Sequence, residues 1–108
     1  MERPLLVYTT FPDADTALAL GEVLVRERLA ACLNVLPGMR SVYAWKGVVE
    51  RGEEVVALIK SREALAEPLI AALKRRHPYE TPVILTLPVG AEPATLAWLV
   101  AETGGTPA

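Results

Sequence analysis

The chain has 108 residues, a net charge of −2 and an isoelectric point of about 5.4, which is the size of a single domain. This acidic balance gives no electrostatic footprint for nucleic acid, and no apolar run approaches the roughly 18–20 residues of a membrane span. A single cysteine excludes an internal disulfide, and the N-terminus lacks the pattern of a secretory signal. We therefore predict one cytoplasmic domain over residues 1–108, with no nucleic-acid and no membrane partner.

In the first half of the chain, residues 5–11 form a short apolar run that is typical of a buried strand. Asp13 is a good N-cap for a helix that presents one apolar face and begins at residue 14. Residues 31–45 are a long extended stretch interrupted by Pro37-Gly38, and a proline there confines the strand to a sheet edge or a bulge. Lys46-Gly47 is the expected hairpin tip, with Arg51-Gly52 as a bulge or an alternative tip.

In the second half, residues 53–61 are predicted to be the returning strand, and Ser61 the cap of a second amphipathic helix. Pro68 lies inside that helix, so we expect a kink or a fresh start there. Residues 83–89 are predicted to form the last strand. Glu92-Pro93 then begins a short helix through residue 102, and residues 103–108 are expected to be a frayed tail.

The order strand, helix, strand, strand, helix, strand predicts a ferredoxin-like α+β fold. Two split crossovers give a four-stranded antiparallel sheet with two helices on one face and a short C-terminal helix. The other face is left uncovered. Apolar residues, counted with glycine and without tyrosine, make up roughly 56% of the chain, against about 45–50% in ordinary domains. This excess favours burial against other subunits, although an alanine-rich helix surface is the alternative.

The segment His77-Pro78-Tyr79-Glu80-Thr81-Pro82 contains the only histidine, beside a phenol and a carboxylate. Prolines fix their own φ and keep the preceding residue extended, so a helix must end near Arg76. Rigid polar loops are more often binding sites than packing devices. A helix stop followed by a proline turn is the alternative interpretation.

A series of motifs in chain order resembles the CutA family of divalent-cation tolerance proteins. They are Ala31-Cys32-Leu33-Asn34, Pro37-Gly38, Ser41-x-Tyr43-x-Trp45-x-Gly47, Glu54, Ile59-Lys60-Ser61 and His77-Pro78-Tyr79-Glu80-x-Pro82. The resemblance implies a ferredoxin-like fold, a homotrimer built through the long hairpin and edge strands, and an architecture like that of PII signalling proteins. It also implies a link to copper and divalent-cation tolerance without a general enzymatic activity.

Cys32 and His77 are natural ligands for Cu²⁺ or zinc, but one of each cannot complete a closed tetrahedral site. The predicted topology separates them by about a strand length, roughly 17–20 Å, within one chain. We therefore expect a metal, most simply Cu²⁺, to be shared between subunits by Cys32, His77 and Glu80. In the same inter-subunit cleft, Asn34, Lys60, Tyr79 and Glu80 are candidates for binding a ligand.

Three other functions stay open on these residues. The cleft could bind a small anionic metabolite through Lys60, Tyr79 and Glu80, as the architectural similarity to PII proteins suggests. The trimer could also be a stable scaffold that anchors another protein. An enzyme is the weakest alternative, because Cys32 and His77 could form a thiolate–imidazole pair only across an interface.

Overall fold

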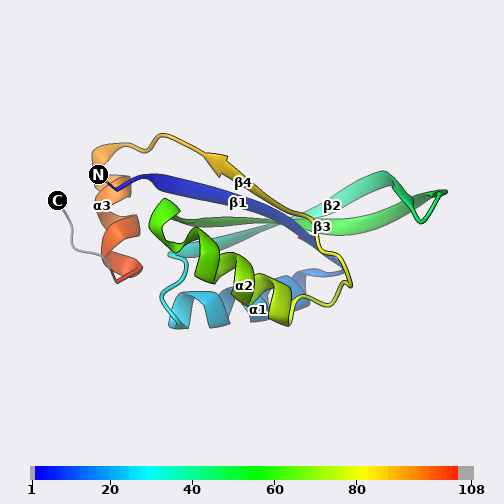
Figure 1. Cartoon of the computed structure of the whole chain (residues 1–108), viewed down its shortest axis with the longest axis horizontal. Helices are drawn as coiled ribbons and strands as arrows, with labels where there is room; N and C mark the ends of the chain where they lie inside the picture. The colour runs from blue at the N-terminus through cyan, green and yellow to red at the C-terminus, as the bar shows by residue number, and fades with distance from the viewer. Residues whose placement is uncertain (1, 105–108) are drawn as a thin grey trace.

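The computed structural model describes residues 2–104 (Figure 1). Its strands and helices follow the predicted order, with one additional short 3₁₀ turn before the second helix. They are β1 (Pro4–Phe11), α1 (Ala14–Arg26), β2 (Cys32–Trp45), β3 (Val48–Arg62), the 3₁₀ turn η1 (Glu63–Leu65), α2 (Ala66–Arg76), β4 (Ile84–Pro88) and α3 (Pro93–Glu102).

The four strands form one antiparallel sheet in the order β2-β3-β1-β4. Helices α1 and α2 lie together on one face of it (Figure 1), which confirms the predicted ferredoxin-like arrangement. The buried core lies between these helices and alternate side chains of the two central strands, including Val7, Phe11, Ala57 and Ile59, which are all fully buried. This alternation follows from the period of two along a strand.

The hairpin of β2 and β3 extends well beyond the sheet's other strands (Figure 1), and the molecule measures 48 × 24 × 23 Å along its principal axes. Its tip is Lys46-Gly47, as predicted, with φ angles of 49° and 81°, the left-handed pair that a two-residue hairpin turn requires. The bulge lies between Leu36 and Met39, at Pro37-Gly38, rather than at Arg51-Gly52, where the ladder is regular.

The second helix begins later than predicted. Ser61 is a residue of β3 that pairs with Leu5, and its hydroxyl donates to the Leu29 carbonyl oxygen at 2.7 Å, so it caps no helix. A fresh start does occur before Pro68, because η1 is followed by α2 from Ala66. Pro68 then lies in the first turn of α2, where its missing N–H would have no helical partner in any case.

Local caps elsewhere behave as predicted. The Asp13 carboxylate accepts the Thr16 N–H at 2.7 Å, and Glu92 accepts the N–H groups of Ala94 and Thr95 at the start of α3. At the other end of α3, Thr103 is only 4% exposed. Residue 103 is therefore packed rather than frayed, whereas residues 105–108 of the predicted tail lie outside the described residues.

No described helix covers the second face of the sheet (Figure 1). Its centre is largely apolar, and two of its β4 side chains, Leu85 and Leu87, are 55% and 41% exposed. Apolar patches of this kind mark contact surfaces. Among residues 2–104, none of the helices has both the length and the apolar character that a membrane crossing requires.

Candidate functional site

His77 lies directly after α2, at the end of the sheet where β1 finishes. Its backbone is extended, with φ −71° and ψ 137°, and caps the helix, as the following proline predicts. The residue is 8% exposed, and its ring stacks on Phe11 with 4.4 Å between ring centroids. The sole histidine is thus part of the packed edge of the core.

Both ring nitrogens of His77 have hydrogen-bond partners. Nε2 lies 2.7 Å from the Thr10 carbonyl oxygen, which can only accept, so Nε2 carries the proton. Nδ1 accepts the backbone N–H of Tyr79 at 3.1 Å. In this arrangement neither nitrogen offers a lone pair to an ion. His77 therefore holds the loop 77–83 against β1, and direct ligation would require one of these bonds to be exchanged.

Stability should fall on mild acidification because of His77. Burial lowers its pKa below the ordinary 6.5, against the raising effects of the Thr10 hydrogen bond and of Glu54. The unfolded chain then binds the proton more readily. Stability is therefore unaffected by this group above pH 6.5, declines below pH 6.5, and levels off once the folded-state pKa is passed.

Urea unfolding at several pH values between 8 and 5 measures this effect, with His77→Gln as the reference for every other titrating group. We expect the wild type to lose more stability than the variant across that range. Parallel losses in the two proteins would show that His77 does not contribute to the pH dependence.

Next to His77, two hydroxyl groups hold the carboxylate of Glu54 in place. The Tyr79 hydroxyl donates to Glu54 Oε2 at 2.8 Å, and the Ser41 hydroxyl donates to Glu54 Oε1 at 3.2 Å. Burial, followed by the hydrogen bond to Glu54, raises the pKa of Tyr79, which therefore stays a phenol at neutral pH. The Glu54 carboxylate of β3 thus links the loop, through Tyr79, to β2, through Ser41.

A groove of about 830 Å³ lies between the loop after α2 and the hairpin, along which it reaches Trp45 beside the tip. Its walls carry the aromatic side chains of Tyr8, Tyr43, Trp45 and Tyr79. Four carboxylates also line it, and among the described residues it has no lysine or arginine in its lining. The carboxylates are Glu50, Glu53, Glu54 and Glu80. In one chain this environment favours cations and disfavours anions.

The remaining predicted site residues gather at the other end of the open sheet face. Cys32 is partly exposed and its thiol lies 3.4 Å from Asn34 Oδ1, to which it donates. Cys32 also pairs with Lys60 across β2 and β3, and Lys60 is exposed between the buried residues Ile59 and Ser61. Cys32, Asn34 and Lys60 therefore form one cluster.

The structure keeps this cluster apart from His77, as the topology predicts. Lys60 pairs with Leu6 of β1, whereas His77 bonds to Thr10, four residues further along the same strand. At about 3.3 Å per residue this is roughly 13 Å along the strand alone. Residues 2–104 contain no grouping of three or more His, Cys, Asp or Glu side chains that could hold an ion.

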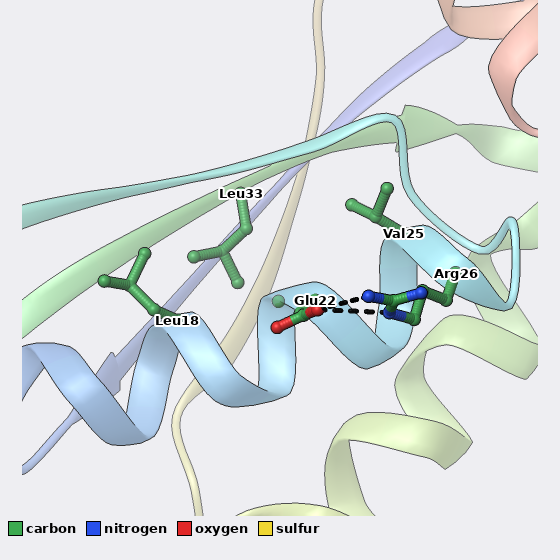
Figure 2. A pocket seen from close by; sticks show the side chains of 6 residues that line it. Leu18, Glu22, Val25, Arg26 and Leu33 are labelled. Atoms are coloured by element: carbon green, nitrogen blue, oxygen red, sulfur yellow. Dashed lines mark hydrogen bonds and ion pairs between the residues drawn. The ribbon is translucent and has the colours of Figure 1, made fainter.

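A second, smaller pocket of about 370 Å³ lies between α1 and β2 (Figure 2). Its lining is mainly the apolar side chains of Leu18, Val25 and Leu33, and at its rim Glu22 pairs with Arg26 at 2.6 Å (Figure 2). An exposed pair of this i, i+4 type is an ordinary helix-surface feature. The chemistry of this chain therefore lies on the open sheet face and in the groove.

Two site residues were not singled out as functional from the sequence. Glu54 appeared only as part of the family motif, and Ser41 likewise. Their joint role depends on the register that places Met39 opposite Glu54 and on Tyr79, which is 25 residues away from Glu54. The alternation of β3, which puts Glu54 on the open face with Val56 and Leu58, is the one sequence signal that could have indicated it.

The four-stranded antiparallel sheet with α1 and α2 on one face defines a ferredoxin-like α+β protein. A model of the family described as CutA1 divalent ion tolerance protein matches residues 5–102. The crystallised divalent cation tolerance protein (Cut A1) of Thermus thermophilus has a TM-score of 0.88 at 36% identity, covering 94% of this chain and 99% of that chain. The chain belongs to the CutA1 divalent ion tolerance protein family.

Two curated relatives match most of this chain, but they differ in how much of their own length the match covers. The divalent-cation tolerance protein CutA of Pectobacterium atrosepticum is 44% identical over 106 residues, which cover 94% of this chain and 96% of the relative. The chloroplastic protein CutA of Arabidopsis thaliana is 38% identical over 100 residues, covering 92% of this chain, which spans only 55% of that relative. Because that relative is named as chloroplastic, the cytoplasmic location of this chain stays a prediction.

Proposed function

We propose that this protein binds divalent cations, Cu²⁺ foremost, as a cytoplasmic homotrimer and contributes to metal tolerance without acting as an enzyme. The observation that carries the proposal is the family match over residues 5–102. Cys32 is partly exposed and Glu80 is exposed, so both can meet an ion between copies. His77 has a positioning role in this scheme, because it holds the loop that carries Glu80.

Trimer formation is supported by the apolar surface that a single chain leaves open. On the hairpin, Val42 and Val49 are 68% and 74% exposed, and Leu85 and Leu87 of β4 are exposed on the open face of the sheet. Both β2 and β4 are edge strands, and exposed edges need a partner or protection. In a trimer, the Cys32 cluster of one copy would lie beside the groove of the next.

Sedimentation velocity tests the assembly. We expect a mass three times the 11.7 kDa of one chain, and we expect Val49→Asp to shift the protein towards monomer because a charge would be buried at the interface. Glu67→Gln on α2 is the control and should leave the trimer intact. A wild type that sediments as a monomer would remove the shared site.

Copper binding is tested by titrating Cu²⁺ into the protein, followed by a count of reduced thiols to exclude oxidation of Cys32. Cys32→Ala should weaken binding at least tenfold, because it removes the only thiolate ligand. Glu80→Gln should weaken it less, and Glu67→Gln, an exposed carboxylate change on α2 across the sheet from Cys32, should leave it unaltered. Equal affinity of the wild type and the Cys32→Ala, His77→Ala double variant would show that neither the Cys32 thiol nor the loop position held by His77 contributes to copper binding.

An anionic metabolite is a second candidate ligand, through Lys60 of one copy facing Tyr79 and Glu80 of another. The acidic lining of the groove argues against it unless that lysine is supplied by a neighbour. Thermal-shift measurements with organic anions in the presence of a chelator separate the two candidates, because only a bound ligand raises the unfolding temperature. A scaffold function predicts instead a protein partner whose binding survives loss of Cys32 and His77.

A further inference from the structure

We propose that Trp98 of one copy inserts into the pocket between α1 and β2 of the next copy, and that this contact links the subunits head to tail. The proposal rests on the trimer proposed above, and it names the residue and the pocket that join the copies. Two unpartnered apolar features carry it, one at each edge of the sheet. Their heights along the sheet and the charged groups beside them are complementary.

The helix α3 has an apolar side that its own chain leaves exposed. Leu99 and Val100 are buried against the rest of the chain. At 3.6 residues per turn Trp98 lies on the far side of the helix, where it is 43% exposed. Only Thr95 and Glu102 are polar in this helix, and a helix that is apolar all round is normally buried all round. Trp98 is therefore placed as an anchor for a second molecule, a role in which tryptophan is enriched.

The pocket between α1 and β2 suits a single aromatic side chain. Its volume of about 370 Å³ is at the low end of the range of roughly 300–1,000 Å³ for pockets that take small molecules. Figure 2 shows the side chains of Leu18, Val25 and Leu33 around it. Leu18 and Val25 are exposed, so the walls are apolar surface in contact with water. Insertion of an indole ring would remove that surface from water.

The pocket and α3 lie at opposite edges of the sheet but at the same height. The pocket borders the edge strand β2, and α3 follows the other edge strand, β4. Leu33 of the pocket pairs with Ile59. Ile59 pairs with Val7, which pairs in turn with Thr86 near the end of β4. Copies placed side by side around an axis along the strands would therefore bring α3 of one copy level with the pocket of the next. A contact of this heterologous kind closes a ring.

The charged groups beside the two features are complementary. Glu102 lies one turn after Trp98 on α3 and is exposed. At the rim of the pocket, Arg26 donates to Glu22 through Nε and Nη2. A guanidinium group has five N–H donors, so Arg26 keeps donors for the Glu102 carboxylate of the next copy. An indole ring in the pocket and a carboxylate at its rim would thus be satisfied by one approach of α3.

Sedimentation velocity over a concentration series of the full chain tests the contact. Trp98→Ala should weaken association at least tenfold, whereas Trp98→Phe, which keeps an aromatic ring, should weaken it about threefold. Val25→Asp puts a charge into the pocket and should weaken association at least tenfold. Glu102→Gln should cost about threefold, as expected for a pair at the rim. Ala71→Asp, at an exposed position on α2, is the matched control and should change association less than twofold.

A mixture of Trp98→Ala and Val25→Asp tests whether the contact is head to tail. Each variant keeps the half that the other lacks, so the mixture should associate more tightly than either variant alone. Fluorescence gives a second measurement, because Trp45→Phe leaves Trp98 as the sole tryptophan. Its emission should lie at shorter wavelength in the assembly than after dilution, and Val25→Asp in this background should move it to longer wavelength.

The failure of this contact can be told apart from the failure of the trimer. A trimeric wild type whose association and Trp98 emission are unchanged by Val25→Asp would overturn the contact and leave the proposed function standing. A mixture that associates no better than its two components would exclude a head-to-tail arrangement. A wild type that is monomeric at every concentration would contradict both proposals.

Discussion

Replacement of Phe11 with alanine is expected to lower the free energy of unfolding by about 3–5 kcal/mol. Phe11 is fully buried at the end of β1, and its ring supports that of His77 at 4.4 Å with an angle of 19° between the planes. The substitution removes a large apolar side chain and also the surface that positions His77. The loop 77–83 should therefore loosen in the same variant.

Urea unfolding followed by circular dichroism, at equal protein concentrations because of the proposed assembly, measures the loss. Phe11→Leu should cost less, about 1–1.5 kcal/mol, since it keeps most of the volume but loses the ring stack. Leu18→Ala is the control, because Leu18 is 51% exposed on α1, and it should cost less than about 1 kcal/mol. A similar loss in Phe11→Ala and Leu18→Ala would show that this edge of the core does not support the site.

Replacement of Gly21 with valine is expected to destabilise the protein by about 1–3 kcal/mol through overpacking. Gly21 lies on the face of α1 that touches β2, and an added Cβ would stand 3.0 Å from Leu33 Cβ and 3.1 Å from its Cδ1 (Leu33 is labelled in Figure 2). The helix would have to move away from the sheet. Valine also loses side-chain freedom in a helix.

Thermal and urea unfolding measure this effect, with Gly90→Val as the matched control, because no atom lies within 4 Å of a Cβ built at Gly90. Gly21→Ala sharpens the test. Helix propensity alone would make that variant about 1 kcal/mol more stable, whereas the close contact with Leu33 should cancel the gain. A clear stabilisation by Gly21→Ala would contradict the close helix–sheet approach.

The parts of the fold that could be predicted are those set by local chemistry. Asp13 and Glu92 cap helices because their side chains reach N–H groups two or three residues away. Lys46-Gly47 turns the hairpin because both residues take left-handed backbone angles. Ser61 shows the opposite case: it has a good capping side chain, but pairing of β3 with β1 uses its backbone as strand. Tertiary pairing there overrides a local preference.

The candidate site could be predicted only in part. The order of strands was enough to place Cys32 and His77 apart. The sequence could not show that Thr10 and the Tyr79 backbone occupy both ring nitrogens of His77, because these partners are backbone groups brought in by the fold. For the same reason the acidic groove was not foreseen, since the strand register and the loop after α2 are what bring Glu54 and Glu80 into one lining.

The shared metal site between copies is the central claim, and a crystal soaked with Cu²⁺ tests it most directly. Anomalous diffraction should locate copper bound by Cys32 Sγ of one copy, with its other protein ligand, Glu80, from the adjacent copy. The imidazole of His77 should keep its bonds to Thr10 and Tyr79. Copper bound by residues of one chain alone would contradict the claim. So would copper bound at full occupancy elsewhere in the crystal with no anomalous density near Cys32.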